Sequence, residues 1–226
     1  MRFWRTLPLP NAWLLASLVA LVLLYPFLDR SAGGHAAIAV FDLAILMLAL
    51  RAARAGGYET RIGWMLVIPA MLLHVGGAFQ LHELIIAAGL LAQAAFHAFV
   101  VSCLLRYMLR DEIMTVDELF AAASLYVLLA FVFAYLYALL EFLAPGAFFI
   151  NEVNNRDGIA TWWELLYFSF TCLTSVGFGE ITPVNDHARS LVMLEQMMGV
   201  LYLALIISRL VTLQSNRADR RRNPDQ

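Results

Sequence analysis

The stretch "TWWELLYFSFTCLTSVGFGEITP", residues 161–183, decides the fold, because it places a glycine-containing peptide between two apolar segments. Thr161 and Glu164 have the spacing of a capping box, which predicts that a helix begins there. The apolar run Trp162–Leu173 is too short to cross a bilayer, but its length is typical of a re-entrant helix. We therefore expect a short helix that enters the membrane and a strand that returns to the side of entry.

The composition of the whole chain indicates a membrane protein. Of 226 residues, 62% are hydrophobic and only 14% are charged, which is too little charge for a soluble domain of this size. A net charge of −2 argues against nucleic acid as a partner. Windows of about 20 apolar residues predict an all-α membrane protein with six transmembrane helices. These helices are expected near Ala12–Leu28, Ala36–Ala53, Ile62–Phe79, Leu84–Leu109, Leu119–Leu143 and Ala188–Leu213.

Arginine placement predicts the orientation. Arginines gather at the start of the chain, in the second and fourth connections and at the end, whereas Arg30, Arg156 and Arg189 fall on the other side. The positive-inside rule then places both termini in the cytoplasm of a cell-membrane protein. A cleaved signal peptide is the alternative for the first helix, whose apolar run is long for that role.

Three regions follow from this topology. Residues 1–110 are expected to form a four-helix module, residues 111–214 a carboxy-terminal domain that contains the opening stretch, and residues 215–226 a short basic cytoplasmic tail. The polar, arginine-rich composition after Gln214 predicts a disordered tail. We expect no soluble ligand-binding domain, and we expect membrane lipids as partners.

The two glycines of the opening stretch explain what its strand can do. An extended strand points successive carbonyls to opposite sides, but Gly177 and Gly179 can adopt positive φ and turn their peptides so that every carbonyl points one way. Rings of such carbonyls replace the water around a dehydrated cation. One chain provides one column of oxygens, so a ring needs several chains.

This stretch resembles the selectivity filter of the potassium-channel family, whose usual form is Thr-Val-Gly-Tyr-Gly-Asp. Here Ser175-Val176-Gly177-Phe178-Gly179-Glu180 follows Thr174. The flanking "YFSFTCLT" resembles the family's pore helix and "EITP" its strand exit. The inner helix, "LEQMMGVLYLALIISRLV", carries Gly199 where these channels often bend. The resemblance extends over residues 118–214.

The resemblance implies a homotetramer with a central pore, in which residues 111–214 form the pore domain. It implies potassium sites formed by the carbonyls of Ser175, Val176, Gly177 and Phe178, with the Ser175 hydroxyl at the inner end, and potassium as permeant ion without a cofactor. Thr171, Glu180 and Glu195 are expected to support the filter. This sequence departs from the family pattern at three positions: serine replaces threonine at 175, phenylalanine replaces tyrosine at 178, and glutamate replaces aspartate at 180. These departures bear on the rigidity of the filter more than on its preference for potassium.

The last apolar segment carries a candidate pore-lining stripe at helical spacing. Its members are Gln196, Gly199, Val200, Leu203, Ile207 and Val211. The large apolar residues at its lower end could close the pore by dewetting. Gly199 is interpreted as a gating hinge or as a site of close helix packing. Glu195 is an intramembrane acid, and we expect it behind the pore helix, hydrogen-bonded to Thr171 or its neighbours, with proton sensing as the alternative.

Polar residues in the first four segments give further candidates. Asp42 and His74 could pair near the outer face, with Gln93 or His97 nearby, as a structural contact or as a pH sensor. The fourth segment has no arginine before Arg106, so it lacks the charges of a conventional voltage sensor.

Other functional classes fit the sequence less well. An intramembrane hydrolase would need a nucleophile elbow, which Ser175 lacks, and His187 lies beyond the filter. Cys103 and Cys172 fall on different predicted helices and are interpreted as small apolar side chains. We therefore predict a potassium-selective channel that is not an enzyme. A weakly selective cation channel and a non-conducting channel subunit remain as alternatives.

Overall fold

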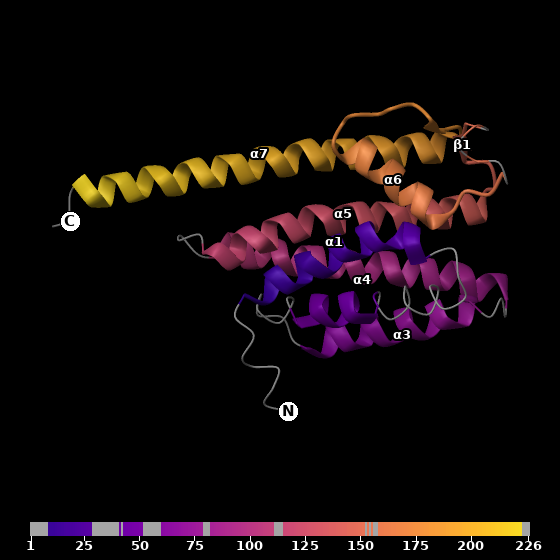
Figure 1. The fold of residues 1–226 in the computed structure, drawn as a ribbon, viewed down its shortest axis with the longest axis horizontal. Helices are drawn as coiled ribbons and strands as arrows, with labels where there is room; N and C mark the ends of the chain where they lie inside the picture. Colours follow the sequence, from indigo (N-terminus) through magenta and orange to yellow (C-terminus); the bar gives the residue numbers. More distant parts are fainter. Residues whose placement is uncertain are drawn as a thin grey trace.

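The computed structural model describes residues 9–28, 41, 43–51, 60–78, 82–110, 115–151, 153, 155 and 158–222. The described part of the chain is helical, with one small two-stranded sheet (Figure 1). Residues 43–51 are also helical. The named elements are α1 (Pro10–Leu28), α3 (Thr60–Ala78), α4 (Glu83–Arg110), α5 (Val116–Leu143), β1 (Phe148–Ile150), α6 (Trp162–Leu173), β2 (Ile181–Pro183) and α7 (Asp186–Arg222).

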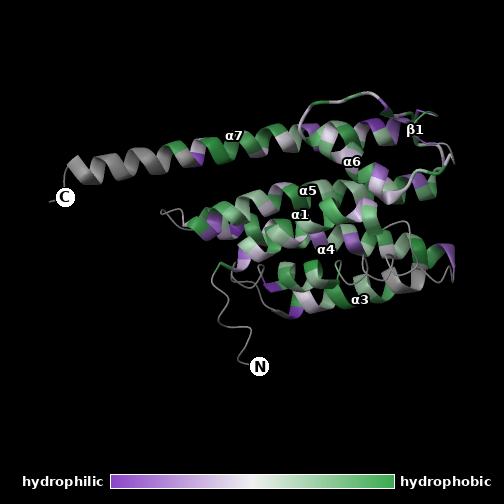
Figure 2. Ribbon diagram, viewed as in Figure 1, coloured by the Kyte–Doolittle hydropathy of each residue, from purple (hydrophilic) through white to green (hydrophobic). Residues whose placement is uncertain are grey.

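Four of the described helices are long and apolar enough to cross a membrane. These are Pro10–Leu28, Glu83–Leu109, Val116–Leu143 and Asp186–Arg209. Figure 2 shows the hydrophobic colouring along them. The predicted second crossing, Ala36–Ala53, lies partly outside the described residues. The third coincides with α3, where the described apolar part, Arg61–Leu73, is shorter than a span. Crossing by these two segments stays a prediction.

Helices α1 and α4 pack on α5 of their own chain, and α3 packs on α4 (Figure 1). Near one end of α5, the Asn11 side chain donates to Asp117 over 2.6 Å, and both residues are buried. Toward the other end of α1, the ring of Tyr25 stacks on Trp163 of α6, with 4.1 Å between the ring centroids. Helix α1 therefore contacts α5 and α6 at two widely separated points.

Helix α5 begins three residues before the predicted Leu119. Thr115 is its N-cap, and the Thr115 hydroxyl and the Glu118 carboxylate each accept a hydrogen bond from the other residue's backbone N–H. This reciprocal capping satisfies two of the unpaired donors at the helix start. The sequence contains this Thr-x-x-Glu spacing at Thr115 and Glu118, so the start of α5 at Val116 could have been predicted from it.

The predicted disordered tail is wrong over most of its length. Helix α7 continues without a break to Arg222 and projects beyond the other helices (Figure 1). Polarity alone suggested disorder, but residues 214–222 are rich in arginine and contain no glycine or proline, which suits a helix. The next residues are Asn223 and Pro224, and proline disfavours helix in the residue before it.

A two-stranded antiparallel sheet joins the loop before α6 to the strand that leaves the glycine-containing peptide. Strand β1 pairs with β2 in the register Phe148↔Pro183 and Ile150↔Ile181. Just beyond the sheet, the Asn151 N–H donates to the Glu180 carbonyl over 2.9 Å. The exit strand was expected, whereas β1 was not. The sheet fixes the end of the peptide that follows α6.

Candidate functional site

Helix α6 coincides with the predicted re-entrant helix, and its capping box is confirmed. The Thr161 hydroxyl accepts from the Glu164 N–H, and the Glu164 carboxylate accepts from the Thr161 N–H over 2.8 Å. Twelve residues at 1.5 Å each give about 18 Å, well short of the roughly 30 Å hydrocarbon core. Its apolar side packs under α5 and the sheet, around the buried rings of Tyr137, Phe148 and Phe168.

The carboxyl end of α6 passes directly into the glycine-containing peptide. The last four carbonyls of a helix have no partner within it and need other donors. Here all four find one. Phe170 accepts from the Thr174 N–H, Thr171 from the Val176 and Gly177 N–H groups, Cys172 from the Ser175 N–H, and Leu173 from the Tyr126 hydroxyl of α5, at 2.9–3.2 Å.

The two hydrogen bonds to the Thr171 carbonyl determine where the next carbonyls point. The N–H groups of Val176 and Gly177 reach this one oxygen at 2.9 and 3.1 Å, so both face α6. In a planar trans peptide the C=O points opposite to the N–H, and the described residues contain no cis peptide bond. The carbonyls of Ser175 and Val176 therefore both point away from α6. An extended strand would send them to opposite sides.

Backbone dihedrals show how this arrangement is built. Ser175, Gly177 and Gly179 have φ of 57°, 55° and 84°, so every second residue is left-handed. Alternating left- and right-handed residues turn successive N–H groups to one side. The positive φ predicted for the two glycines is confirmed. Left-handed Ser175 was not expected, because such a backbone strains a residue with a Cβ; strain of this kind clusters at functional sites.

The peptide is exposed along its whole length in a single chain. Residues 174–179 are all exposed, and the apolar Val176 and Phe178 are 55% and 70% exposed. The Thr174 hydroxyl donates back to the Phe170 carbonyl over 2.7 Å. The Ser175–Gly177 segment is thus fixed to the protein through its N–H groups, and its carbonyl side is uncovered.

Tyr167 of α6 holds the outer part of the peptide. Its ring is parallel to that of Phe178 within 4°, with centroids 6.5 Å apart, and its hydroxyl donates to the Glu180 carboxylate. Phe178 lacks a hydroxyl that could form a hydrogen bond to α6. Instead, the Tyr167 hydroxyl of α6 forms a hydrogen bond to Glu180, which links the helix to this peptide. The sequence analysis missed Tyr167, because a tyrosine within an aromatic run carries no spacing signal.

Changing Tyr167 to phenylalanine tests this tie. We expect the ring contact to remain and the hydrogen bond to Glu180 to be lost, which weakens local protection by about 1 kcal/mol for an exposed bond to a carboxylate. Amide hydrogen exchange at residues 178–184 should then be several-fold faster. Tyr202→Phe is the control, because the Tyr202 hydroxyl donates to Ala122 on α5. Equal exchange in Tyr167→Phe and the unmodified protein would contradict the assignment.

Glu195 lies behind α6, as predicted. Its side chain is completely buried and bonded to the hydroxyls of Tyr137 on α5 and Ser169 on α6. Its α6 partner is thus a neighbour of Thr171. The Thr171 hydroxyl instead donates to the Phe168 carbonyl over 2.8 Å. Thr171 therefore supports the peptide through its backbone, and Glu195 joins three helices.

Gly199 lies on the face of α7 that packs on its own chain. A Cβ placed there would be 2.2 Å from the Leu173 carbonyl oxygen. This supports the close-packing interpretation, and a hinge at Gly199 stays a prediction, because α7 is an unbroken helix there. The other members of the predicted stripe lie on the exposed side of α7. Val200, Leu203, Ile207 and Val211 are 57%, 45%, 60% and 61% exposed, and Gln196 is also exposed.

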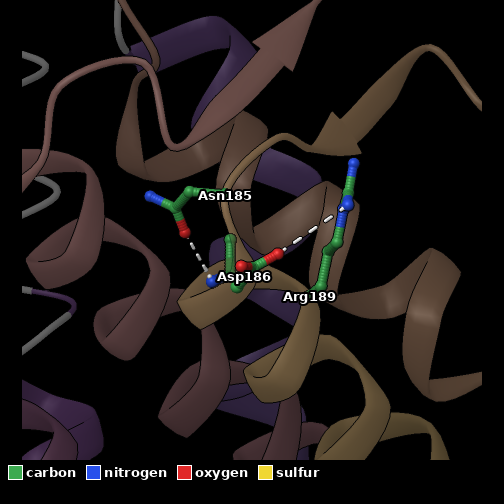
Figure 3. A network of polar contacts seen from close by, with 4 residues as sticks. Asn185, Asp186 and Arg189 are labelled. Carbon is green, nitrogen blue, oxygen red and sulfur yellow. Dashed lines mark hydrogen bonds and ion pairs between the residues drawn. The ribbon is translucent and has the colours of Figure 1, made fainter.

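Asn185 fixes the start of α7 directly after β2 (Figure 3). Its side-chain oxygen accepts from the Ala188 N–H over 2.8 Å, which caps the helix. Asp186 and Arg189 form an exposed ion pair at 3.9 Å, which adds little stability. The cap explains why α7 begins at Asp186, two residues before the predicted Ala188.

The remaining polar candidates do not form one site among the described residues. Asp42 lies outside them, as does the side chain of His74. His97 is buried between α4 and α5, with its ring centroid 5.3 Å from that of Tyr135 and its Nδ1 2.8 Å from the Gln93 carbonyl. The two free cysteines, Cys103 on α4 and Cys172 on α6, are buried on different helices, as predicted.

Comparison with known proteins found a match in the carboxy-terminal region of the chain. Residues 122–215 match a family model described as "Ion channel". The match covers less than half of the chain and includes most of α5, all of α6, the glycine-containing peptide and the membrane part of α7. No curated protein and no solved structure matches the chain. The match supports an ion channel domain and passive ion transport rather than an enzyme, and with the apolar helices it indicates a multi-pass membrane protein.

Proposed function

We propose that this protein is a potassium-selective channel that conducts passively through a pore shared by four chains. The observation that carries the proposal is the pair of hydrogen bonds from the Val176 and Gly177 N–H groups to the Thr171 carbonyl. They turn two successive carbonyls away from the protein, as a column of cation ligands requires. The positive φ of Gly177 and Gly179 supports the proposal that the carbonyls of Gly177 and Phe178 follow the same pattern.

Potassium would bind between the carbonyls of Ser175, Val176, Gly177 and Phe178, with the Ser175 hydroxyl at the inner end. Each carbonyl replaces part of the hydration shell of the ion. The carboxyl end of α6 is the negative end of a helix dipole and favours a cation beyond it. Thr174 and Gly179 frame the column at its two ends. Potassium is the permeant ion, and no cofactor takes part.

A homotetramer would cover the surfaces that a single chain leaves open. One column of oxygens cannot surround an ion, so the columns of several chains must face a common axis. The exposed apolar residues of α7, which include Val200, Leu203 and Ile207, would then line the inner pore or contact neighbouring chains. An apolar constriction in the lower part of this lining closes a pore by dewetting. Lipid would cover the outer faces of the remaining helices.

Conventional voltage sensing forms no part of this proposal. Helix α4 has arginine only at Arg106 and Arg110, near one end. Steep voltage dependence needs several charges per subunit that move through the membrane field, each contributing about 2.3 kcal/mol per 100 mV. In the proposed six-crossing topology both termini would lie in the cytoplasm, and the helical extension of α7 would carry its arginines beyond the membrane on that side.

Ion flux into liposomes that contain the purified tetramer tests the proposed function. We expect potassium flux that barium blocks and that disappears when sodium replaces potassium. Equal sodium and potassium flux would overturn potassium selectivity and favour a weakly selective cation channel. Absence of flux from an intact tetramer at every pH and voltage would favour a non-conducting channel subunit.

A further inference from the structure

The buried carboxyl of Glu195 holds a position that the proposed conduction pathway does not use. It lies where α5, α6 and α7 meet, and the side chains of Glu195, Tyr137 and Ser169 are all completely buried. One carboxyl oxygen accepts from the Tyr137 hydroxyl, and the other contacts the Ser169 hydroxyl. This group is thus a polar junction of the three helices of the channel domain.

The hydrogen-bond geometry at Ser169 favours a neutral carboxyl at Glu195. The Ser169 oxygen is also 2.9 Å from the Ala130 carbonyl of α5. A serine hydroxyl has one proton to donate, and a backbone carbonyl can only accept. Each contact is a full two-centre hydrogen bond if Ser169 donates to Ala130 and the carboxyl of Glu195 donates to Ser169, whereas a Glu195 carboxylate would have to share the single Ser169 proton with the Ala130 carbonyl. The first arrangement requires a protonated, neutral Glu195.

The surroundings of Glu195 favour the neutral form. The titratable groups that face it are Tyr126 and Tyr137 of α5 and Cys172 of α6, none of which is a cation in any protonation state. Among the described residues, no arginine or histidine is recorded in an ion pair with it. A buried carboxylate without a cationic partner is costly, whereas a buried neutral acid with satisfied hydrogen bonds is not.

We propose that Glu195 is a proton-binding site whose neutral carboxyl joins α7 to α6 and keeps the filter in its conducting form. Ser169 is two residues before Thr171, whose carbonyl holds the N–H groups of Val176 and Gly177. When Glu195 loses its proton, it can no longer donate to Ser169, and a charge remains between the helices. The end of α6 then shifts relative to α7, and the carbonyl column loses its alignment.

Infrared spectroscopy of the purified tetramer tests the proton directly. The protein should show the carbonyl band of a buried, protonated carboxyl group at neutral pH, and this band should disappear in Glu195→Gln. Ser169→Ala should shift the band, because the group loses its hydrogen-bond acceptor. The control Glu83→Gln changes an exposed acid and should leave the band in place. A spectrum with no band that depends on residue 195 would overturn the proposal.

Flux at alkaline pH tests the consequence and rests on the proposed function, whereas the infrared experiment does not. Glutamine can donate to Ser169 and accept from Tyr137, as the neutral acid does. We therefore expect the unmodified protein and Glu83→Gln to lose most of their potassium flux as the pH is raised. Glu195→Gln should keep its flux over the same range. The same alkaline loss in Glu195→Gln would overturn the coupling to the filter.

Discussion

Alanine in place of Gly177 should abolish potassium flux. Gly177 has φ of 55°, a left-handed conformation that costs a residue with a Cβ about 1–2 kcal/mol. Relief of this strain rotates the Val176–Gly177 peptide. That rotation breaks the Gly177 N–H bond to Thr171 and turns the Val176 carbonyl away from the ion. Since each of the four chains would contribute the same defect to one ring, we expect a loss of flux far larger than tenfold.

Gly158→Ala is the matched control for this experiment. Gly158 also has positive φ, 68°, and a Cβ at either glycine would meet no atom within 4 Å. The two substitutions therefore introduce similar backbone strain and differ in whether the affected peptide belongs to the filter. Liposome flux should be lost in Gly177→Ala and retained in Gly158→Ala, with both proteins tetrameric. Normal selective flux through Gly177→Ala would contradict the assigned carbonyl sites.

Alanine in place of Gly199 should destabilise the tetramer as well as reduce flux. The added Cβ would lie 2.2 Å from the Leu173 carbonyl oxygen, which is backbone and cannot rotate away. Helix α7 must then separate from the end of α6, at a cost of about 1–3 kcal/mol per chain for an overpacked contact. The carbonyl that moves also accepts from Tyr126, so the base of the filter moves with it. Thermal denaturation of the tetramer measures the effect.

Gly63→Ala is the control for Gly199→Ala, because its added Cβ would meet a side chain rather than the backbone. Its added Cβ would be 2.1 Å from Cδ1 of Leu50, the end of a side chain that can adopt another rotamer. We expect a small change in thermal stability for Gly63→Ala and a large one for Gly199→Ala. A Gly199→Ala tetramer of unchanged stability but altered opening would favour the hinge interpretation over packing.

Local signals in the sequence explain which parts of the site could be predicted. The capping box and the length of the apolar run predicted the helix Trp162–Leu173, and the two glycines predicted positive φ at residues 177 and 179. The left-handed Ser175 could not be predicted in this way, because its conformation is imposed by the hydrogen bonds of the neighbouring N–H groups to α6. Residue type alone disfavours it.

The side chains that hold residues 174–180 and the end of α6 could not be predicted from residue spacing. Tyr126, Tyr137 and Tyr167 lie in apolar segments where tyrosine is an ordinary packing residue. Their hydroxyl partners are determined by how α5, α6 and α7 are rotated against one another, and periodicity does not specify that rotation. The tail shows the opposite error, because polar composition was interpreted as disorder although the residues have good helix propensity.

The position of the permeant ion tests the central claim most directly. Crystals of the purified protein grown with rubidium, a heavier substitute for potassium, would locate bound ions by anomalous scattering. We predict a row of peaks on a four-fold axis, each surrounded by carbonyl oxygens of residues 175–178 from four chains. A tetramer whose 174–179 segments enclose no ion, or whose carbonyls point away from the shared axis, would contradict the account.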